Sequence, residues 1–327
     1  MRDRAIAAVL CLALAGCSAD QSPGARKSLT IAGVALNATD PFWITVHCGA
    51  AREAAELGVR LDWSATATVD LRTQAVNLHT ALLSRPEGLI LVPASEGTFV
   101  SHVERLMREG TPVAVVSARL ARPVEYRRVG TDPGDSGPYE TLARKIAKDT
   151  GGHGKLAILA GIPGTPLDEP RWGPLTDAVG RVAPGVEVLA PEYPGTDRTK
   201  AAATVAGLLL RHRDLRAVYA TSGPEGIGAA QAVRESGRDV AVYAYDAMPE
   251  EVAALRKGEI AALLAQSPET MGRAAVRSLV EYVRAGHEGA VPAGRPADLH
   301  TPSMVLTREN VDTPAARVFH YRADCKA

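Results

Sequence analysis

The sequence predicts an α/β protein made of two doubly wound parallel-sheet lobes, and three observations lead to this fold class. Short apolar runs alternate with longer amphipathic ones along almost the whole chain, which is typical of strands followed by helices. The apolar runs are nearly continuous, as in parallel strands that helices cover on both faces. The alternation begins again after residue 131, and 327 residues are enough for two domains of roughly 100–200 residues each.

The first half of the chain supplies four predicted strands and the helices between them. The run 29–36 (LTIAGVAL) is the first buried strand, and the breakers Gly58 and 110–112 (GTP) separate later elements. The remaining strands are predicted at 59–63, 89–92 and 113–116, and the helices at 42–57, 70–84 and 97–109.

The second half repeats this order, with glycine-rich turns such as 151–154 (GGHG) at the joints. Strands are predicted at 156–159, 186–189, 217–220, 240–245, 260–265 and 303–306. Helices are predicted at 135–149, 171–182, 198–211, 225–236, 249–256 and 269–285.

The N-terminus has the pattern of an export signal. Arg2 and Arg4 precede the apolar run 5–16 (AIAAVLCLALAG), which ends in small residues. The run is too short to cross a bilayer, which takes roughly 20 residues. Leu-Ala-Gly directly before Cys17 resembles the bacterial lipobox, which implies cleavage there and lipidation of Cys17; the alternative is a plain secretory signal with a chance cysteine. Residues 1–17 are then the signal peptide and 18–28 a flexible tether.

Two further cysteines, Cys48 and Cys325, remain after Cys11 in the signal and Cys17 at the lipid position. Both are expected in an oxidising compartment, where two leftover cysteines can pair. We predict a Cys48–Cys325 disulfide. The alternative is two separate buried thiols, since a free cysteine packs as a small apolar side chain.

Charge and motifs exclude several classes of function. The 37 basic and 37 acidic residues balance, and no basic stripe indicates a nucleic-acid surface. The sequence has no Gly-x-Ser-x-Gly, His-Glu-x-x-His or Cys-x-x-Cys motif, and its eight histidines are scattered. We therefore expect no enzyme activity, no cofactor and no metal.

Candidate ligand-binding residues lie where predicted strands end, because ligands bind beyond the carboxyl ends of parallel strands. Asp40, Phe42 and Trp43 follow the first strand, and the whole chain has only three Phe and three Trp. An aromatic face can stack on a sugar ring or another flat ligand. The alternative for the rings is packing onto the core, and Asp40 can be a helix cap, a ligand acceptor or both.

Four more candidates follow strands of the second half. Arg171 offers five fixed donors and precedes Trp172, while Asp246 is an acceptor and Gln266 is both donor and acceptor. The alternatives are a solvated arginine at a helix start and a helix cap at Asp246.

At these residues the chain resembles the periplasmic sugar-binding proteins of ABC importers, of the ribose-binding type. Asp40-Pro41-Phe42-Trp43 resembles that family's Asn-Pro-Phe-Phe loop, and Arg171-Trp172-Gly173 lies where the family has a ligand-binding arginine. Tyr245-Asp246 resembles a Phe-Asp pair, Ala265-Gln266-Ser267-Pro268 resembles a hinge segment with a ligand-binding glutamine, and Gly130-Thr131-Asp132 resembles the segment after the first crossover. The order and spacing of these motifs carry the resemblance.

The resemblance implies the type I periplasmic binding protein fold, with two lobes joined by three hinge crossings near 118–131, 266–268 and 295–300. The predicted N-terminal lobe comprises 29–118 and 267–295, and the C-terminal lobe comprises 131–265. Residues 296–327 form a hinge strand and a C-terminal tail. The tail extends past the end of ribose-binding proteins and carries Cys325.

The chain also departs from the ribose-binding pattern. Ser117-Ala118-Arg119 stands where those proteins have Asp-Arg, and Thr221-Ser222-Gly223 stands where they have Asn. Ser117, Arg119 and Ser222 are therefore candidate ligand contacts of changed chemistry. A buried polar ligand group left unpaired costs about 1–3 kcal/mol, so another pentose, a hexose or a polyol fits better than ribose.

The implied function is capture of a small sugar or polyol outside the cytoplasm and its delivery to an ABC permease in the membrane. The protein is expected to be a lipid-anchored monomer that binds no nucleic acid. The alternative is a sensory receptor of the same fold that presents its ligand to a membrane signalling kinase.

Overall fold

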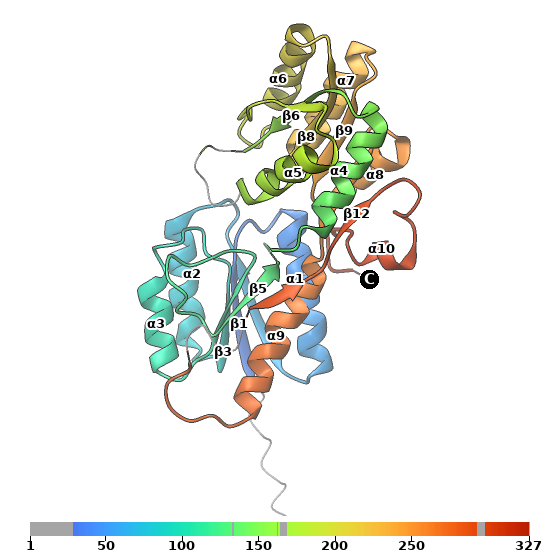
Figure 1. Cartoon of the computed structure of the whole chain (residues 1–327). Coiled ribbons are helices and arrows are strands. Elements are labelled where there is room, and N and C mark those ends of the chain that lie inside the picture. Colours follow the sequence, from blue (N-terminus) through green and yellow to red (C-terminus); the bar gives the residue numbers. More distant parts are fainter. Residues whose placement is uncertain (1–28, 133, 162, 164–168, 293–297, 327) are drawn as a thin grey trace, which may run out of the picture.

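The structure is a computed structural model that describes residues 29–326, apart from 133, 162, 164–168 and 293–297. The predicted signal peptide, the tether and Cys17 lie outside the described residues. The described chain forms two lobes, one above the other in Figure 1. Among the described helices, none combines the length and the apolar character needed to cross a membrane.

The first lobe contains a six-stranded sheet in the order β11-β5-β4-β3-β1-β2, and all of its strand pairs are parallel. Helices α2 and α3 lie on one face, and α1 and α9 on the other (Figure 1). The strands are β1 (Thr30–Ala35), β2 (Arg60–Ala65), β3 (Gly88–Leu91), β4 (Val113–Val116), β5 (Arg127–Thr131) and β11 (Leu299–Thr301); the helices are α1 (Pro41–Glu56), α2 (Leu71–Leu83), α3 (Val100–Arg108) and α9 (Pro268–Arg284).

The second lobe contains a six-stranded sheet in the order β12-β10-β9-β8-β6-β7, in which only the β10–β12 pair is antiparallel. Helix α4 packs against α5, and α7 packs against both α6 and α8. The strands are β6 (Gly154–Leu159), β7 (Val186–Val188), β8 (Leu215–Ala220), β9 (Ala241–Tyr245), β10 (Ala262–Gln266) and β12 (Ser303–Leu306); the helices are α4 (Gly137–Thr150), α5 (Glu169–Val182), α6 (Arg198–Arg211), α7 (Gly223–Ser236), α8 (Pro249–Lys257) and α10 (Pro314–Arg317).

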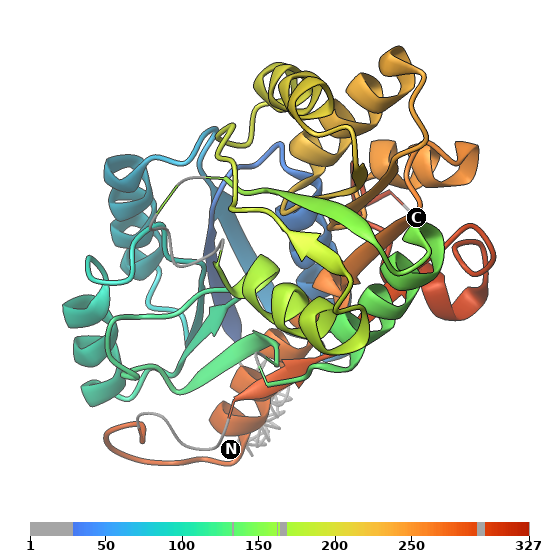
Figure 2. The ribbon, with the colours of Figure 1, turned by 45° about the horizontal axis from the view of Figure 1, so that its top comes forward.

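Both sheets are doubly wound, which confirms the predicted fold class. The strand order reverses between β1 and β3 in the first sheet and between β6 and β8 in the second. The turned view in Figure 2 shows helices flanking the sheets of both lobes. The carboxyl ends of the strands next to each reversal are where an open α/β sheet binds ligands.

Three strands belong to sheets although they lie outside or at the border of the predicted lobes: β5 and β11 in the first sheet, and β12, expected in the hinge strand and tail, in the second. β5 and β11 both pair within the first sheet, although 118–131 and 295–300 were expected to be hinge crossings. The chain instead passes between the sheets after Thr131, after Gln266 and at Pro302, which separates β11 from β12. β5 carries two arginines and β11 has only three residues, so neither has the continuous apolar run that predicts a buried strand.

Two glycines let α1 and α9 pack backbone against backbone. A Cβ on Gly49 would lie 2.1 Å from the carbonyl oxygen of Glu269, and a Cβ on Gly272 would lie 2.0 Å from that of Val46. The two helices begin directly after Asp40 and Ser267. Their close contact therefore fixes the loop between β1 and α1 relative to the point after Gln266 where the chain passes between the lobes.

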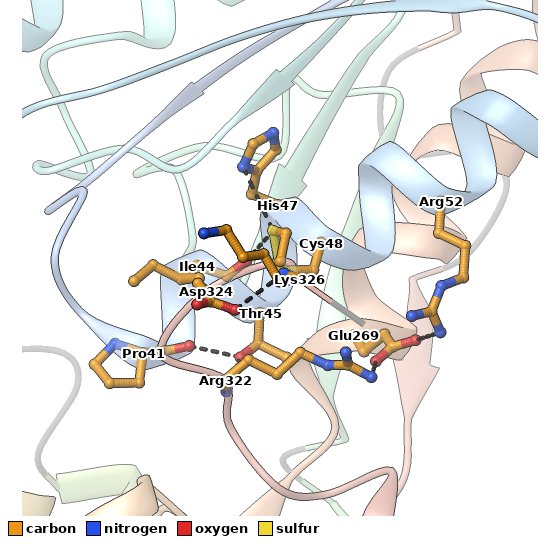
Figure 3. The surroundings of a disulfide bond; sticks show 11 residues. Pro41, Ile44, Thr45, His47, Cys48, Arg52, Glu269, Arg322, Asp324 and Lys326 are labelled. Carbon is orange, nitrogen blue, oxygen red and sulfur yellow. Dashed lines mark hydrogen bonds and ion pairs between the residues drawn. A yellow bond between two sulfur atoms is a disulfide. The ribbon is translucent and has the colours of Figure 1, made fainter.

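The predicted disulfide is confirmed: Cys48 in α1 bonds to Cys325 in the tail, with a Cα–Cα distance of 5.1 Å and a sequence separation of 277. Figure 3 shows the tail lying along the start of α1, where the Arg322 guanidinium reaches Glu269. A closed loop of this length contributes about 5–6 kcal/mol in the chain-entropy model. The bond holds the end of the chain on the first lobe.

We expect Gly272→Ala to destabilise the protein, because an added methyl group would have to push α1 away from α9. Overpacking of this kind lowers the free energy of unfolding by about 1–3 kcal/mol or more. The control is Gly180→Ala in α5, where nothing lies within 4 Å of the added Cβ and the helix gains propensity. Denaturant midpoints measure both, and equal midpoints for the two variants would contradict the packing argument.

Candidate functional site

Four of the predicted site residues meet at the carboxyl ends of strands. Asp40 follows β1, Asp246 follows β9 and Gln266 ends β10. Arg171 lies in the first turn of α5, on the connection from β6 to β7. This arrangement follows from the parallel strands, whose carboxyl ends lie at the same edge of each sheet.

Asp246 is the centre of this group. Its side chain is buried, with the residue 4 % exposed, and it faces three donors. Tyr321 Oη donates to Oδ1 at 2.8 Å, Gln266 Nε2 donates to Oδ1 at 3.2 Å, and Arg171 Nη1 lies 3.5 Å from Oδ2. A buried charge needs such partners. The Asp246 backbone has a positive φ of 87°, a conformation that costs free energy and is found at functional sites.

Arg171 is held on several sides. Its Nη1 donates to the carbonyl oxygen of Thr221 at 2.8 Å, and its guanidinium lies 4.6 Å from the ring centre of Tyr245. The hydroxyl of Tyr219 donates to the Arg171 carbonyl at 2.9 Å. Burial lowers the pKa of Arg171, but Asp246 acting together with the surrounding tyrosines outweighs this effect and raises that pKa above its ordinary value. Arg171 is thus a fixed cation with donors left for a ligand.

Asp40 caps α1 and also belongs to the electrostatic group. Its Oδ1 accepts a hydrogen bond from the backbone N–H of Phe42 at 2.8 Å, so the helix-cap alternative is confirmed. Burial raises the pKa of Asp40; the Phe42 N–H opposes this, and the nearby charge of Asp246 adds to the rise. The carboxylates of Asp40 on the first lobe and Asp246 on the second therefore repel each other electrostatically across the two lobes.

The two aromatic side chains after Asp40 form an edge-to-face cluster with the tail. Phe42 meets Trp43 at 4.6 Å between ring centres and Tyr321 at 5.4 Å. Phe42 is buried in an apolar core, as the packing alternative predicted, whereas Trp43 is only partly buried against it. Both rings remain next to the residues that surround Asp246, which together with Asp40 we call the interlobe group.

The other predicted residues differ in position. Ser222 is buried, and within the described part of the chain its Oγ has no hydrogen-bond partner. Ser117 is half-buried at the end of β4 with a φ of 52°. Trp172 packs against the apolar cluster of the second lobe. Arg119 is exposed, and no hydrogen bond or ion pair between described residues joins it to the group around Asp246.

The sequence interpretation missed Tyr321, although a signal was present. It stands four residues before Cys325, and Cys325 is tied to Cys48, six residues after Phe42 in α1. Six residues of helix span about 9 Å, and four residues of extended chain cover more than that. A tail fixed at Cys48 can therefore bring Tyr321 to Phe42.

A cavity of about 570 Å³ lies away from this group, between the ends of α2, α3 and α9, and includes Arg85, Glu109, Tyr282 and His287. Its lining comes from the loops that precede β3 and β4, at the amino ends of the strands. The chemistry described above lies at the other end of the sheet, where ligands of open α/β sheets bind, so we base the site on Asp246 and not on this cavity.

The arrangement is suited to binding. Acceptors, a fixed cation, an amide, an unpaired hydroxyl and aromatic rings come from two lobes and converge where the strands end, which is the pattern of a small-molecule site. Across the described residues no group of three or more His, Cys, Asp or Glu could hold a metal ion. Fold and site together define a two-lobed solute-binding protein.

Comparison with known proteins identifies the family. A model described as "Periplasmic binding protein domain" matches residues 31–288, which is most of the chain, so the protein belongs to that family and the resemblance found in the sequence is confirmed. The chain is 29% identical over 286 residues to the ribose import binding protein RbsB of Salmonella typhimurium, covering 86% of this chain and 93% of that protein. It is 24% identical to the D-allose-binding periplasmic protein of Escherichia coli, covering 81% and 88%.

Solved structures show the same fold. GanP, a glucose-galactose binding protein from Geobacillus stearothermophilus, is 26% identical with a TM-score of 0.71 and covers 88% of this chain and 100% of its own. A sugar-binding protein from Bacillus halodurans is 21% identical with a TM-score of 0.79 and covers 86% and 99%.

We expect Asp246→Asn to destabilise the folded protein. Asparagine tolerates a positive φ, so this change mainly removes the charge and leaves a half-buried guanidinium facing an amide. Such a loss lowers the free energy of unfolding by about 1–3 kcal/mol. Asp312→Asn is the control, because Asp312 pairs with Arg256 on the surface, where ion pairs contribute little. Thermal melting of both variants checks this, and an unchanged midpoint for Asp246→Asn would contradict it.

Proposed function

We propose that the protein captures a small sugar or polyol between its lobes and delivers it to an ABC permease in the membrane. The observation that carries this proposal is the convergence of Arg171, Asp246 and Gln266 from the second lobe with Asp40 and the aromatic pair from the first. Closure of two lobes on a ligand is a known hinge motion of such folds.

The chemistry of these residues matches a polyhydroxylated ligand. Each sugar hydroxyl is both donor and acceptor, so it can give to Asp246 and receive from Arg171. Gln266 offers both roles, and the unpaired hydroxyl of Ser222 offers another. The rings of Phe42 and Trp43 supply the apolar surface on which the C–H face of a sugar packs.

The relatives support a sugar, and the departures from the ribose pattern favour one other than ribose. The similar proteins carry names for ribose and D-allose, and one solved neighbour from Agrobacterium vitis is bound with alpha-D-tagatopyranose. By the resemblance drawn from the sequence, the segments 117–119 and 221–223, with Ser117 and Ser222, stand where the ribose-binding type has an Asp-Arg and an Asn. A ligand with a different set of hydroxyl positions fits this exchange.

The proposed place of action is outside the cytoplasm, on a lipid anchor at Cys17. Family membership supports the extracytoplasmic site, and the disulfide fits an oxidising compartment. The tether 18–28 then joins the lipid to a single, monomeric two-lobed unit.

A sugar panel tests the ligand class. Purified mature protein is titrated with D-ribose, D-allose, D-tagatose, D-arabinose, D-glucose and D-galactose, and its melting temperature is followed. A ligand at 100 times its dissociation constant adds about 2.7 kcal/mol of stability, so at least one sugar other than ribose should raise the melting temperature clearly.

Variants locate the binding. Arg171→Ala should weaken the best sugar about tenfold or more, since charged hydrogen bonds contribute about 1.5–3 kcal/mol. Arg144→Ala, on the surface of α4 where it pairs with Glu140, is the control and should bind as the wild type does. If no sugar stabilises the wild type, the ligand class is wrong; if Arg171→Ala binds unchanged, the site is wrong.

Cell fractionation tests the anchor. The full-length wild-type chain should sediment with membranes, and Cys17→Ser should move it to the soluble exported fraction, because the thiol that carries the lipid is lost. Cys11→Ser is the matched control inside the same signal and should stay with the membranes. A Cys17→Ser protein that still sediments would contradict lipidation at Cys17.

A further inference from the structure

The C-terminal tail runs from the second lobe to the first. Near its start, Asp312 pairs with Arg256 of α8 at 2.6 Å. The backbone N–H of Tyr321 donates to the Ala247 carbonyl at 3.0 Å, still on the second lobe. One residue later, the Arg322 N–H donates to Oγ1 of Thr45 in α1 at 2.6 Å. Tyr321 thus stands where the tail changes lobes.

Three contacts hold the end of the tail on the first lobe. Besides the Thr45 bond, the Arg322 guanidinium lies 3.0 Å from Glu269 at the start of α9, and Cys325 is bonded to Cys48 (Figure 3). Glu269 also pairs with Arg52 of α1. The tail is therefore anchored to the helix pair α1 and α9, whose N-termini border the interlobe group.

Tyr321 itself is placed like a residue of the site. It is 3 % exposed, as is Gln266, and Asp246 is 4 % exposed. Its ring contacts Phe42 of the first lobe, and its hydroxyl donates to Asp246 of the second. Burial raises the pKa of Tyr321, so the hydroxyl keeps its proton and acts as the donor.

This bond changes what Asp246 can offer a ligand. A carboxylate oxygen has two lone pairs, and Oδ1 accepts from both Tyr321 and Gln266. A sugar hydroxyl can then reach the carboxylate only through Oδ2, on the side of Arg171. The phenol oxygen of Tyr321 can itself accept a hydrogen bond. Tyr321 therefore blocks one lone pair of Oδ1 but offers a sugar hydroxyl another acceptor at the same position.

We propose that Tyr321 is a specificity-determining residue of the ligand site and that the Cys48–Cys325 disulfide holds it there. This inference rests on the proposed sugar-binding function. It explains why the tail is tied to α1: without the tie, the tyrosine would leave Phe42, and the lone pair of Oδ1 that it occupies would be open to the ligand, while Gln266 would still donate to the other.

Calorimetry with the six-sugar panel tests the inference on the full mature chain. Tyr321→Phe keeps the ring and removes the hydroxyl, so it should weaken the best wild-type sugar about tenfold or more and change the order of preference. The variant Cys48→Ser/Cys325→Ser should shift affinity and order in the same way. Val318→Ala, at an exposed position of the same tail, is the control and should match the wild type within about twofold.

The order of preference among the sugars distinguishes a ligand-binding role of Tyr321 from a purely structural one. If Tyr321→Phe lowers the melting temperature but leaves affinities and order unchanged, the inference is overturned while sugar binding stands. If the wild type binds no sugar, the proposed function fails, and amide hydrogen exchange decides the inference. The Tyr321 amide should then exchange at least about tenfold faster in Cys48→Ser/Cys325→Ser than in the wild type; equal exchange overturns the inference.

Discussion

The burial of one carboxylate is the constraint on which the rest of the site depends. Asp246 is almost fully enclosed, and an ionised group in that position is costly unless donors compensate it. The donors come from three separate parts of the chain: Arg171 from α5, Gln266 from the end of β10 and Tyr321 from the tail. The second lobe, the interlobe crossing and the tail are therefore coupled through a single side chain.

The backbone conformation at the carboxyl ends of three strands is constrained as well. Asn37, Ser117 and Asp246 follow β1, β4 and β9, and all three have a positive φ without being glycine. This conformation turns the chain sharply out of the sheet at the cost of about 1–3 kcal/mol per residue. All three turns lie at the carboxyl ends of parallel strands, which is where open α/β sheets bind ligands.

Local pattern was enough to predict most of the fold, and it failed where long-range contacts decide. Helix α6 begins and ends as its amphipathic pattern predicts. β5 and β11 were missed because their stability comes from pairing at one side of the first sheet rather than from an apolar run. Tyr321 was missed because its position depends on a disulfide between residues 277 apart in the sequence, so the signal appears only when the distance from Cys48 to Phe42 is compared with the length of chain between Cys325 and Tyr321.

The two lobes bring different chemistry to a shared ligand. The first lobe supplies the rings of Phe42 and Trp43 and the carboxyl of Asp40, whose pKa burial raises. The second supplies the fixed cation Arg171 and the partly saturated Asp246. On the proposed function, a sugar held between them places a C–H face against the rings of the first lobe and hydroxyls against Arg171 and Asp246 of the second. If the tail occupies one lone pair of Asp246 as proposed, the choice among sugars depends on hydroxyl geometry and not on overall polarity.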